Sequence, residues 1–247
     1  MLNSFCWSFR FIILLITNLY VINSFAQTNS CKLEVHQLTG NFYVYTTWQI
    51  LSGEPYPSNS MYLVTKKGVV LFDTPWDSTC FQPLLDSIRI RHHKKPVMCI
   101  STHFHADRTA GLDFFNAHGI KTYTSYLTDS LSIVRNEPRA KCHFTNDTSF
   151  CIGGYCFSSY YPGEGHTKDN IVIWFEKEKI LYGGCFVKST ENNDIGNIAD
   201  ANLEAWSKSV EKLINKFQQP AYIIPGHLSW ASNKSLEHTL YLLKNKQ

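Results

Sequence analysis

The side chains best suited to chemistry lie close together in one short run of the sequence. The run reads Thr102-His103-Phe104-His105-Ala106-Asp107-Arg108. In an extended segment, residues two apart share a face, so we expect His103, His105 and Asp107 to point together while the two residues between them pack. Imidazole nitrogen and carboxylate oxygen are both ligands of zinc. The run therefore predicts a metal centre; the plainer alternative is a loop that carries three polar residues.

Three more potential zinc ligands each follow a glycine. They are His166 in Gly165-His166-Thr167, Cys185 in Gly183-Gly184-Cys185 and His227 in Pro225-Gly226-His227. Histidine, cysteine and aspartate form a donor set that zinc favours. Six such side chains divide into two incomplete shells, and an open coordination position is typical of a catalytic zinc, whereas four protein ligands close a structural one. We therefore predict catalytic zinc.

The elements that precede these residues must bring them together. Runs rich in β-branched and aromatic residues predict strands at residues 41–45, 61–64, 68–72, 97–100, 171–175, 179–182 and 221–224. Apolar residues at helical spacing predict helices at residues 79–92, 201–217 and 236–243. His103, His166, Cys185 and His227 each come shortly after an apolar run. Sites gather beyond the carboxyl ends of strands, so we expect these four to converge at one edge.

Strands interleaved with single helices predict an α/β layered fold. The chain of 247 residues fits one domain, and no low-complexity tract or clear repeat divides it. Its formal charge of +3 falls by one to +2 if Arg10 is removed with the N-terminal segment. A charge this small gives no indication of a nucleic-acid or membrane-surface partner.

The first 26 residues predict an export signal. Arg10 precedes the apolar run from Phe11 to Ile16, and Ser24-Phe25-Ala26 supplies the small residues that a signal peptidase needs. We expect cleavage after Ala26, which leaves residues 27–247 as the mature catalytic domain. A membrane anchor is the alternative, but the unbroken apolar stretch is well short of the roughly 20 residues that span a bilayer.

The cysteines fit an oxidising compartment. Eight are present and Cys6 lies in the predicted signal, which leaves an odd number in the mature chain. Cys151 and Cys156 flank Gly153-Gly154, a pattern that predicts a hairpin with the two cysteines opposite each other and within reach of a disulfide. The pattern gives no pairing for the remaining cysteines other than Cys185, which are Cys31, Cys80, Cys99 and Cys142.

Taken together, these motifs resemble the metallo-β-lactamase superfamily, and specifically the dizinc lactamase subclass whose second site contains cysteine. The resemblance covers essentially the whole mature chain and implies an αββα sandwich with two zinc ions per chain. It implies that the first zinc is held by His103, His105 and His166. It implies that the second is held by Asp107, Cys185 and His227.

The resemblance also implies roles in binding substrate. Lys188 in Gly184-Cys185-Phe186-Val187-Lys188-Ser189 matches the residue that recognises the β-lactam carboxylate, and Asn197 in Gly196-Asn197 matches the one that assists the carbonyl oxygen. Asp107 and Asn197 are then the catalytic residues. Arg108 and Asp73 would orient the metal ligands. Residues 48–59, with Gly53, Pro55 and Pro57 between two expected strands, resemble the family's flap over the site.

The implied activity is hydrolysis of the β-lactam amide bond of penicillins, cephalosporins and carbapenems, with monobactams spared, by a periplasmic monomer that confers antibiotic resistance. Zinc lowers the pKa of bound water to about 7 and so supplies hydroxide at neutral pH. The remaining histidines have no matching spacing, and we expect them to be surface or packing residues: His36, His92, His93, His118, His143 and His238.

The sequence leaves three alternative functions open. A thioester hydrolase of the glyoxalase type or a phosphodiesterase of the same superfamily usually has histidine directly after the motif's aspartate, where this chain has Arg108. A zinc-scavenging protein of the periplasm would bind the metal without turnover. A redox-active di-iron protein would have more carboxylate ligands than Asp107 alone.

Overall fold

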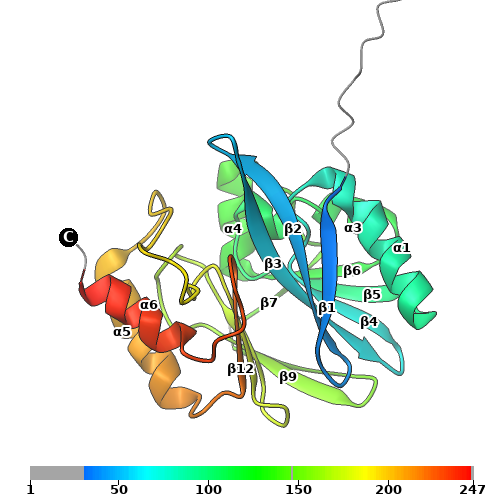
Figure 1. The fold of residues 1–247 in the computed structure, drawn as a ribbon. Coiled ribbons are helices and arrows are strands. Elements are labelled where there is room, and N and C mark those ends of the chain that lie inside the picture. The colour runs from blue at the N-terminus through cyan, green and yellow to red at the C-terminus, as the bar shows by residue number, and fades with distance from the viewer. Residues whose placement is uncertain (1–30, 146, 246–247) are drawn as a thin grey trace, which may run out of the picture.

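The computed structural model describes residues 31–145 and 147–245 as two β-sheets packed face to face between helices (Figure 1). The predicted signal, residues 1–26, lies outside the described residues. Among the residues described, no helix is long and apolar enough to cross a membrane.

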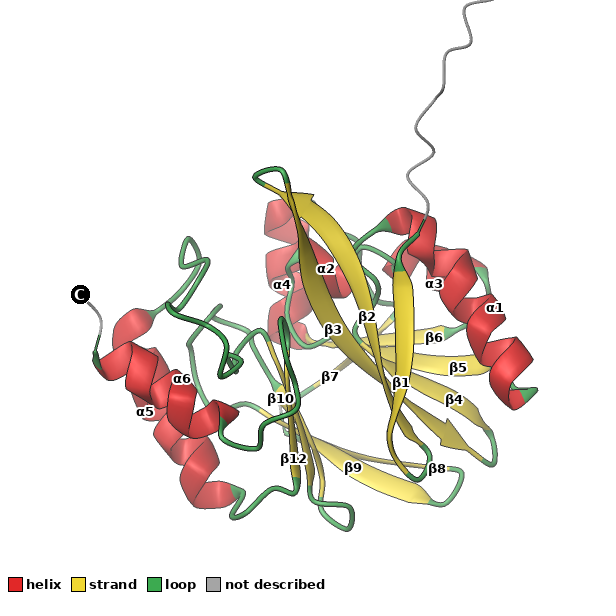
Figure 2. Cartoon of the chain, viewed as in Figure 1, coloured by secondary structure: helices red, strands yellow, loops and turns green. Residues whose placement is uncertain are grey.

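The first sheet has seven strands in the order β1-β2-β3-β4-β5-β6-β7. Pairing is antiparallel from β1 to β4 and parallel from β4 to β7. The strands are β1 (Leu33–Thr39), β2 (Phe42–Leu51), β3 (Glu54–Thr65), β4 (Gly68–Phe72), β5 (Pro96–Ile100), β6 (Lys121–Ser125) and β7 (Cys142–Phe144). The β2–β3 hairpin is the longest element of this sheet and projects beyond its neighbours (Figure 2).

The second sheet has five strands in the order β12-β11-β10-β9-β8. Only β11 and β12 are parallel, and the other pairs are antiparallel. The strands are β8 (Thr148–Ile152), β9 (Tyr155–Tyr160), β10 (Val172–Phe175), β11 (Ile180–Gly184) and β12 (Tyr222–Pro225).

Helices cover the outer face of each sheet (Figure 1). Those described are η1 (Ser78–Cys80), α1 (Phe81–His92), α2 (Ala106–Thr109), α3 (Leu112–Ala117), α4 (Tyr126–Arg135), α5 (Leu203–Lys216) and α6 (Ser235–Lys244). Helices α1 and α3 pack on the first sheet through Leu84, Ile88 and Phe115. Helices α5 and α6 pack on the second through Trp206 and Leu236.

A third apolar cluster fills the space between the two sheets. It is built from side chains such as Phe42, Leu63, Phe72, Phe175 and Tyr182, which are almost fully buried. Burial of this apolar surface is the main force that holds the layers together. The order helix, sheet, sheet, helix confirms the predicted αββα sandwich.

All seven predicted strands and all three predicted helices are present; the strand at 68–72 has the predicted bounds, and the boundaries of the others are shifted by one to several residues. The expectation of an extended run at 102–108 is wrong, because residues 102–105 form bends and Asp107 lies in α2. Residues 48–59 do not form a loop between strands, because β2 continues to Leu51 and β3 begins at Glu54. The segment that the resemblance likens to a flap is therefore a two-stranded ribbon with a short turn.

Two disulfides tie down the described chain. Cys151 and Cys156 are paired across the β8–β9 hairpin, which confirms the prediction from the Gly-Gly turn. Cys31 and Cys80, which sequence did not pair, join the segment before β1 to η1. The free cysteines among the described residues are Cys99, Cys142 and Cys185.

Candidate metal centre

Three histidines from two loops surround a common point. His103 and His105 follow β5, and His166 follows β9. Their ring centroids lie 4.8 Å (His103 to His105), 5.1 Å (His103 to His166) and 5.0 Å (His105 to His166) apart, with the rings nearly perpendicular to one another. His103 and His166 are buried, and His105 is partly exposed. This triangle is the set that the resemblance assigns to the first zinc.

Aspartate, cysteine and histidine form a second group beside it. Cys185 Sγ lies 3.1 Å from Asp107 Oδ2 and 3.2 Å from His227 Nε2, and the same carboxylate oxygen is 3.2 Å from that imidazole nitrogen. The potential ligand atoms of these three residues all lie within 4.8 Å of one another. His103 belongs to two further such groups, one with His105 and Asp107 and one with His166 and Cys185. All six sequence-predicted metal ligands are thus brought together.

Glycines allow the Cys185 and His227 loops to meet. Gly184 and Gly226 lie at the ends of the parallel strands β11 and β12, and Gly226 N donates to Gly184 O at 2.7 Å. A Cβ on Gly226 would lie 2.6 Å from Cys185 N, closer than real Cβ contacts allow. Gly184 also has a φ of +53°, a backbone conformation that glycine adopts without steric cost.

Arg108 is a fully buried cation behind this group. Its Nε and Nη2 donate to Cys185 Sγ at 3.2 and 2.9 Å, and its Nη2 lies 3.0 Å from Asp107 Oδ2. It also donates to Asn59 O at 2.7 Å and Gly226 O at 3.0 Å. A planar guanidinium can make these bonds in fixed directions at once, so Arg108 joins α2, β3 and the two ligand loops.

The charges of the group follow from these contacts. Burial opposes ionisation of Asp107, but Arg108 and His227 outweigh it and hold the pKa of the Asp107 carboxyl well below its usual value. Burial raises the pKa of the Cys185 thiol, and the Arg108 guanidinium acts in the opposite direction. Burial also lowers the pKa of His103 and His166, so both imidazoles are neutral and able to bind a metal.

Asp73 stabilises the histidine loop, residues 102–105, which carries His103 and His105. Its Oδ1 accepts from Thr102 N at 2.6 Å and its Oδ2 from Thr102 Oγ1 at 2.9 Å. Tyr182 also donates to this carboxylate. Complete burial raises the pKa of Asp73 to about 6, against the influence of Arg108, whose Nη1 is 3.6 Å away. Asp73 therefore holds Thr102, the residue before His103, in place. It makes no hydrogen bond to any of the six candidate metal ligands.

The two groups open into a cavity of about 460 Å³. The lining residues are Leu51, Tyr56, Trp76, His105, Ala106, Asp107, His166, Lys188, Gly196, Asn197 and His227. Tyr56 and Trp76 form an aromatic wall, with ring centroids 5.0 and 6.2 Å from that of His227. The cavity therefore joins polar ligand atoms to an apolar surface, as small-molecule sites do.

Lys188 and Asn197 stand at this cavity, as the resemblance implies. Lys188 is 7% exposed, and among the described residues no carboxylate lies within ion-pair distance of its ammonium. Burial lowers its pKa, and its Nζ lies 5.3 Å from the Trp206 ring centroid. Asn197 Oδ1 accepts from Ala199 N at 3.1 Å, which turns the amide so that its NH2 group is the free end.

Comparison with known proteins agrees with this geometry. The sequence model of the family described as "Metallo-beta-lactamase superfamily" matches residues 53–227. The chain belongs to the metallo-β-lactamase superfamily. It is 42% identical over 226 residues to metallo-beta-lactamase type 2 of Elizabethkingia meningoseptica, covering 92% of this chain and 90% of that one. It is 43% identical over 209 residues to metallo-beta-lactamase IND-1 of Chryseobacterium indologenes, covering 85% and 87%.

Solved structures of the family superpose closely on this one. The crystal structure of metallo-beta-lactamase IND-7 has a TM-score of 0.84 and 42% identity, and the match covers 86% of this chain and 98% of that one. The metallo-beta-lactamase from Pontibacter korlensis also has a TM-score of 0.84, with 33% identity and coverage of 87% and 100%.

The side chains present fit the metal that this family implies. His103 Nε2 is buried and has no hydrogen-bond partner among the described residues. His103 nevertheless belongs to two of the three groups of potential metal ligands, one with His166 and Cys185 and one with His105 and Asp107. A buried polar atom without a partner is costly, and a cation at this point would remove the cost. Nitrogen, sulfur and oxygen donors together suit zinc.

Sequence reasoning missed Asp200, which contacts a candidate ligand. Its Oδ2 accepts from His105 Nε2 at 3.0 Å, and its Oδ1 accepts from Arg135 at the end of α4. Asp200 is 95 residues from His105 in the chain. No motif in the sequence connects these two residues.

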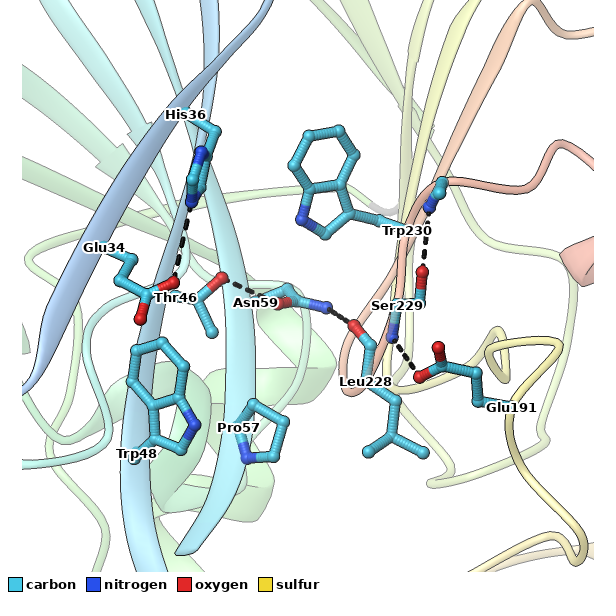
Figure 3. Close-up of a pocket in the computed structure, with 11 residues that line it drawn as sticks. Glu34, His36, Thr46, Trp48, Pro57, Asn59, Glu191, Leu228, Ser229 and Trp230 are labelled. Atoms are coloured by element: carbon cyan, nitrogen blue, oxygen red, sulfur yellow. Dashed lines mark hydrogen bonds and ion pairs between the residues drawn. The ribbon is translucent and has the colours of Figure 1, made fainter.

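A second cavity, of about 420 Å³, lies on the other face of the β2–β3 hairpin (Figure 3). Residues alternate along a strand, so Trp48, Pro57 and Asn59 face this cavity, whereas Tyr56 faces the metal centre. Asn59 Nδ2 donates to Leu228 O at 2.7 Å, and Pro57 O accepts from His227 Nδ1 at 2.8 Å. The hairpin is thus one wall shared by two cavities, and it holds the His227 imidazole in position.

Proposed function

We propose that the protein is a zinc-dependent β-lactamase that hydrolyses the amide bond of penicillins, cephalosporins and carbapenems and so confers antibiotic resistance. The observation that carries the proposal is the convergence of six metal-ligating side chains beside a buried, unpaired lysine ammonium. Membership of the family and 42% identity to a protein named metallo-beta-lactamase type 2 support the same activity.

We further propose that the centre takes two zinc ions. His103, His105 and His166 would hold the first, and Asp107, Cys185 and His227 the second, as the two adjacent groups of donors suggest. Zinc bound there would supply a nucleophile from water at neutral pH and would polarise the scissile carbonyl. Arg108 would stabilise the thiolate that Cys185 forms on a bound metal, by donating two hydrogen bonds to the sulfur.

The cavity supplies the contacts that a β-lactam requires. Lys188 would bind the substrate carboxylate as a point charge, which orients the ring over the ligand groups. The NH2 group of Asn197 would donate to the carbonyl oxygen as negative charge develops on it. Asp107, held ionised, would accept a hydrogen bond from the attacking water and orient it. Tyr56 and Trp76 would pack against the apolar substituents of the antibiotic.

Three further properties belong to the same proposal. Residues 1–26 would direct export and be removed, and residues 27–247 would act as a monomeric catalytic domain in the periplasm. The disulfides Cys31–Cys80 and Cys151–Cys156 support an oxidising compartment. Mass spectrometry of the exported protein would locate the cleavage site, and cell fractionation would locate the enzyme.

The experiment that tests the function is hydrolysis of nitrocefin by purified, zinc-loaded protein. We expect turnover that a chelator abolishes and added zinc restores, and we expect hydrolysis of a penicillin, a cephalosporin and a carbapenem but not of aztreonam. Tight zinc binding without turnover would instead identify a zinc-scavenging protein. Hydrolysis of a thioester in place of a β-lactam would identify the glyoxalase-type alternative.

A further inference from the structure

Asp200 links the histidine loop to a helix and to the segment that carries Asn197. One carboxylate oxygen accepts from His105 Nε2 at 3.0 Å, and the other accepts from the guanidinium of Arg135. Arg135 is the last residue of α4, and its guanidinium carbon lies 5.7 Å from the ring centroid of Phe104, the residue before His105. Three separate parts of the chain therefore meet at Asp200.

We propose that Asp200 and Arg135 are positioning residues of the hydrolytic centre. Asp200 orients the His105 ring so that Nδ1 is directed to the metal, and Arg135 holds Asp200 and, through it, the Asn197 segment. The part of this inference that concerns Asn197 rests on the proposed β-lactamase function. The part that concerns His105 rests only on metal binding.

The first role follows from the chemistry of imidazole. A neutral imidazole has one N–H and one free lone pair. Because Nε2 is the nitrogen that contacts the Asp200 carboxylate, Nε2 carries the hydrogen and Nδ1 keeps the lone pair for a metal. A carboxylate in this position fixes the orientation of a metal-binding histidine and makes it a better donor.

The second role follows from how the Asn197 segment is held. Among the described residues, the hydrogen bonds of residues 196–199 stay within the segment: Gly196 N to Asp194, Ala199 N to Asn197, and Ala201 N to Ile198 O. The segment is next tied at Asn202, whose N donates to Gly165 O at 2.8 Å. Asp200 is thus the residue through which hydrogen bonds connect it to α4 and to the histidine loop.

Another ion pair of similar exposure provides the matched control. Arg139 donates two hydrogen bonds of 2.8 Å to Asp129, with side-chain exposures of 50% and 12%. The Arg135 and Asp200 side chains are 53% and 19% exposed. Neither Arg139 nor Asp129 lines the metal cavity. Arg139→Gln therefore removes a comparable ion pair without touching the centre.

The test measures zinc affinity and kinetics separately for Asp200→Ala, Asp200→Asn, Arg135→Gln, Arg135→Lys and Arg139→Gln. Competition with a chromophoric chelator gives the zinc dissociation constants without any turnover. For Asp200→Ala we expect zinc binding weaker by about 10- to 100-fold. Asp200→Asn keeps an acceptor oxygen and the size of the side chain, so its loss should be smaller, and it serves as the readout if the alanine variant does not fold.

Arg135→Gln leaves the bond between His105 and Asp200 intact. We expect zinc affinity within about threefold of the wild type, a fall in kcat for nitrocefin of about tenfold with little change in KM, and partial rescue by Arg135→Lys. Arg139→Gln should match the wild type in both measurements.

Two results would overturn the inference. Zinc binding by both Asp200 variants as tight as in the wild type would remove the role of Asp200, and kinetics of Arg135→Gln equal to those of Arg139→Gln would remove the role of Arg135. Absence of nitrocefin hydrolysis in the wild type would refute the proposed function instead, while the zinc measurements would still decide the role of Asp200.

Discussion

Removal of the Arg108 side chain should destabilise the metal-free protein severely. Arg108 is fully buried, contacts Asp107 at 3.0 Å and donates to Cys185 Sγ, Asn59 O and Gly226 O. In Arg108→Ala the Asp107 carboxylate and the two carbonyl oxygens stay buried without this partner. Breaking a buried ion pair in this way costs about 3–5 kcal/mol.

The assay is equilibrium unfolding in urea, monitored by tryptophan fluorescence, in the presence of a chelator so that metal binding does not contribute. Arg139→Ala is the control, because the Arg139 side chain is 50% exposed and its ion pair with Asp129 is open to solvent on that side; solvent-exposed pairs contribute about 0.2–1 kcal/mol. A loss of less than about 1 kcal/mol in Arg108→Ala, or a loss equal to that of Arg139→Ala, would refute the assignment of Arg108 as the residue that holds the ligand loops together.

Three further predictions follow from single features of the structure. In Gly226→Ala the new Cβ would lie 2.6 Å from Cys185 N, so we expect a loss of about 1–3 kcal/mol in urea unfolding and weaker zinc binding; unchanged values would contradict this contact. Lys188→Ala should lower kcat/KM by about 10- to 100-fold for a β-lactam with a free carboxylate and much less for its methyl ester, and equal losses for both substrates would argue against a carboxylate contact. Hydrogen bonds from Arg139 lower the pKa of Asp129 from 3.8, so their stabilising effect is present above that value and is lost as the pH falls through the folded-state pKa. Urea unfolding midpoints measured between pH 6 and 2 should therefore fall more steeply in the wild type than in Asp129→Asn. Parallel curves for the two proteins would contradict the assignment.

The sequence predicted the layers because most core elements carry their apolar residues at a regular spacing. Strand β4 and helix α5 are clear cases: every residue of β4 is buried, and the buried residues of α5 are Trp206, Ser209, Val210 and Leu213. The same pattern fails for α4. Its buried residues are Thr128, Asp129 and Ser132, whereas Tyr126, Ile133 and Val134 are exposed, so hydrophobic periodicity could not reveal it.

The candidate site was predictable to the extent that its residues lie in short motifs. Metal ligands must be particular residue types, and His103, His105 and Asp107 form a local motif with a fixed spacing of two residues. The conformation of that run was not, because Arg108 in α2 is fully buried and its partners Asn59 and Gly226 are far away in the sequence. The role of Asp200 depends on contacts 65 and 95 residues away, with Arg135 and His105, and no local pattern reports them.

The most direct test of the account compares zinc content and nitrocefin turnover in the wild type and in Cys185→Ser. Cys185 lies within 3.2 Å of both Asp107 and His227, so its thiolate is central to the second group of donors. We predict about two zinc ions per wild-type chain, weaker binding of one of them in the variant, and a severe loss of turnover. Wild-type turnover together with unchanged zinc content in Cys185→Ser would contradict the two-zinc hydrolytic centre.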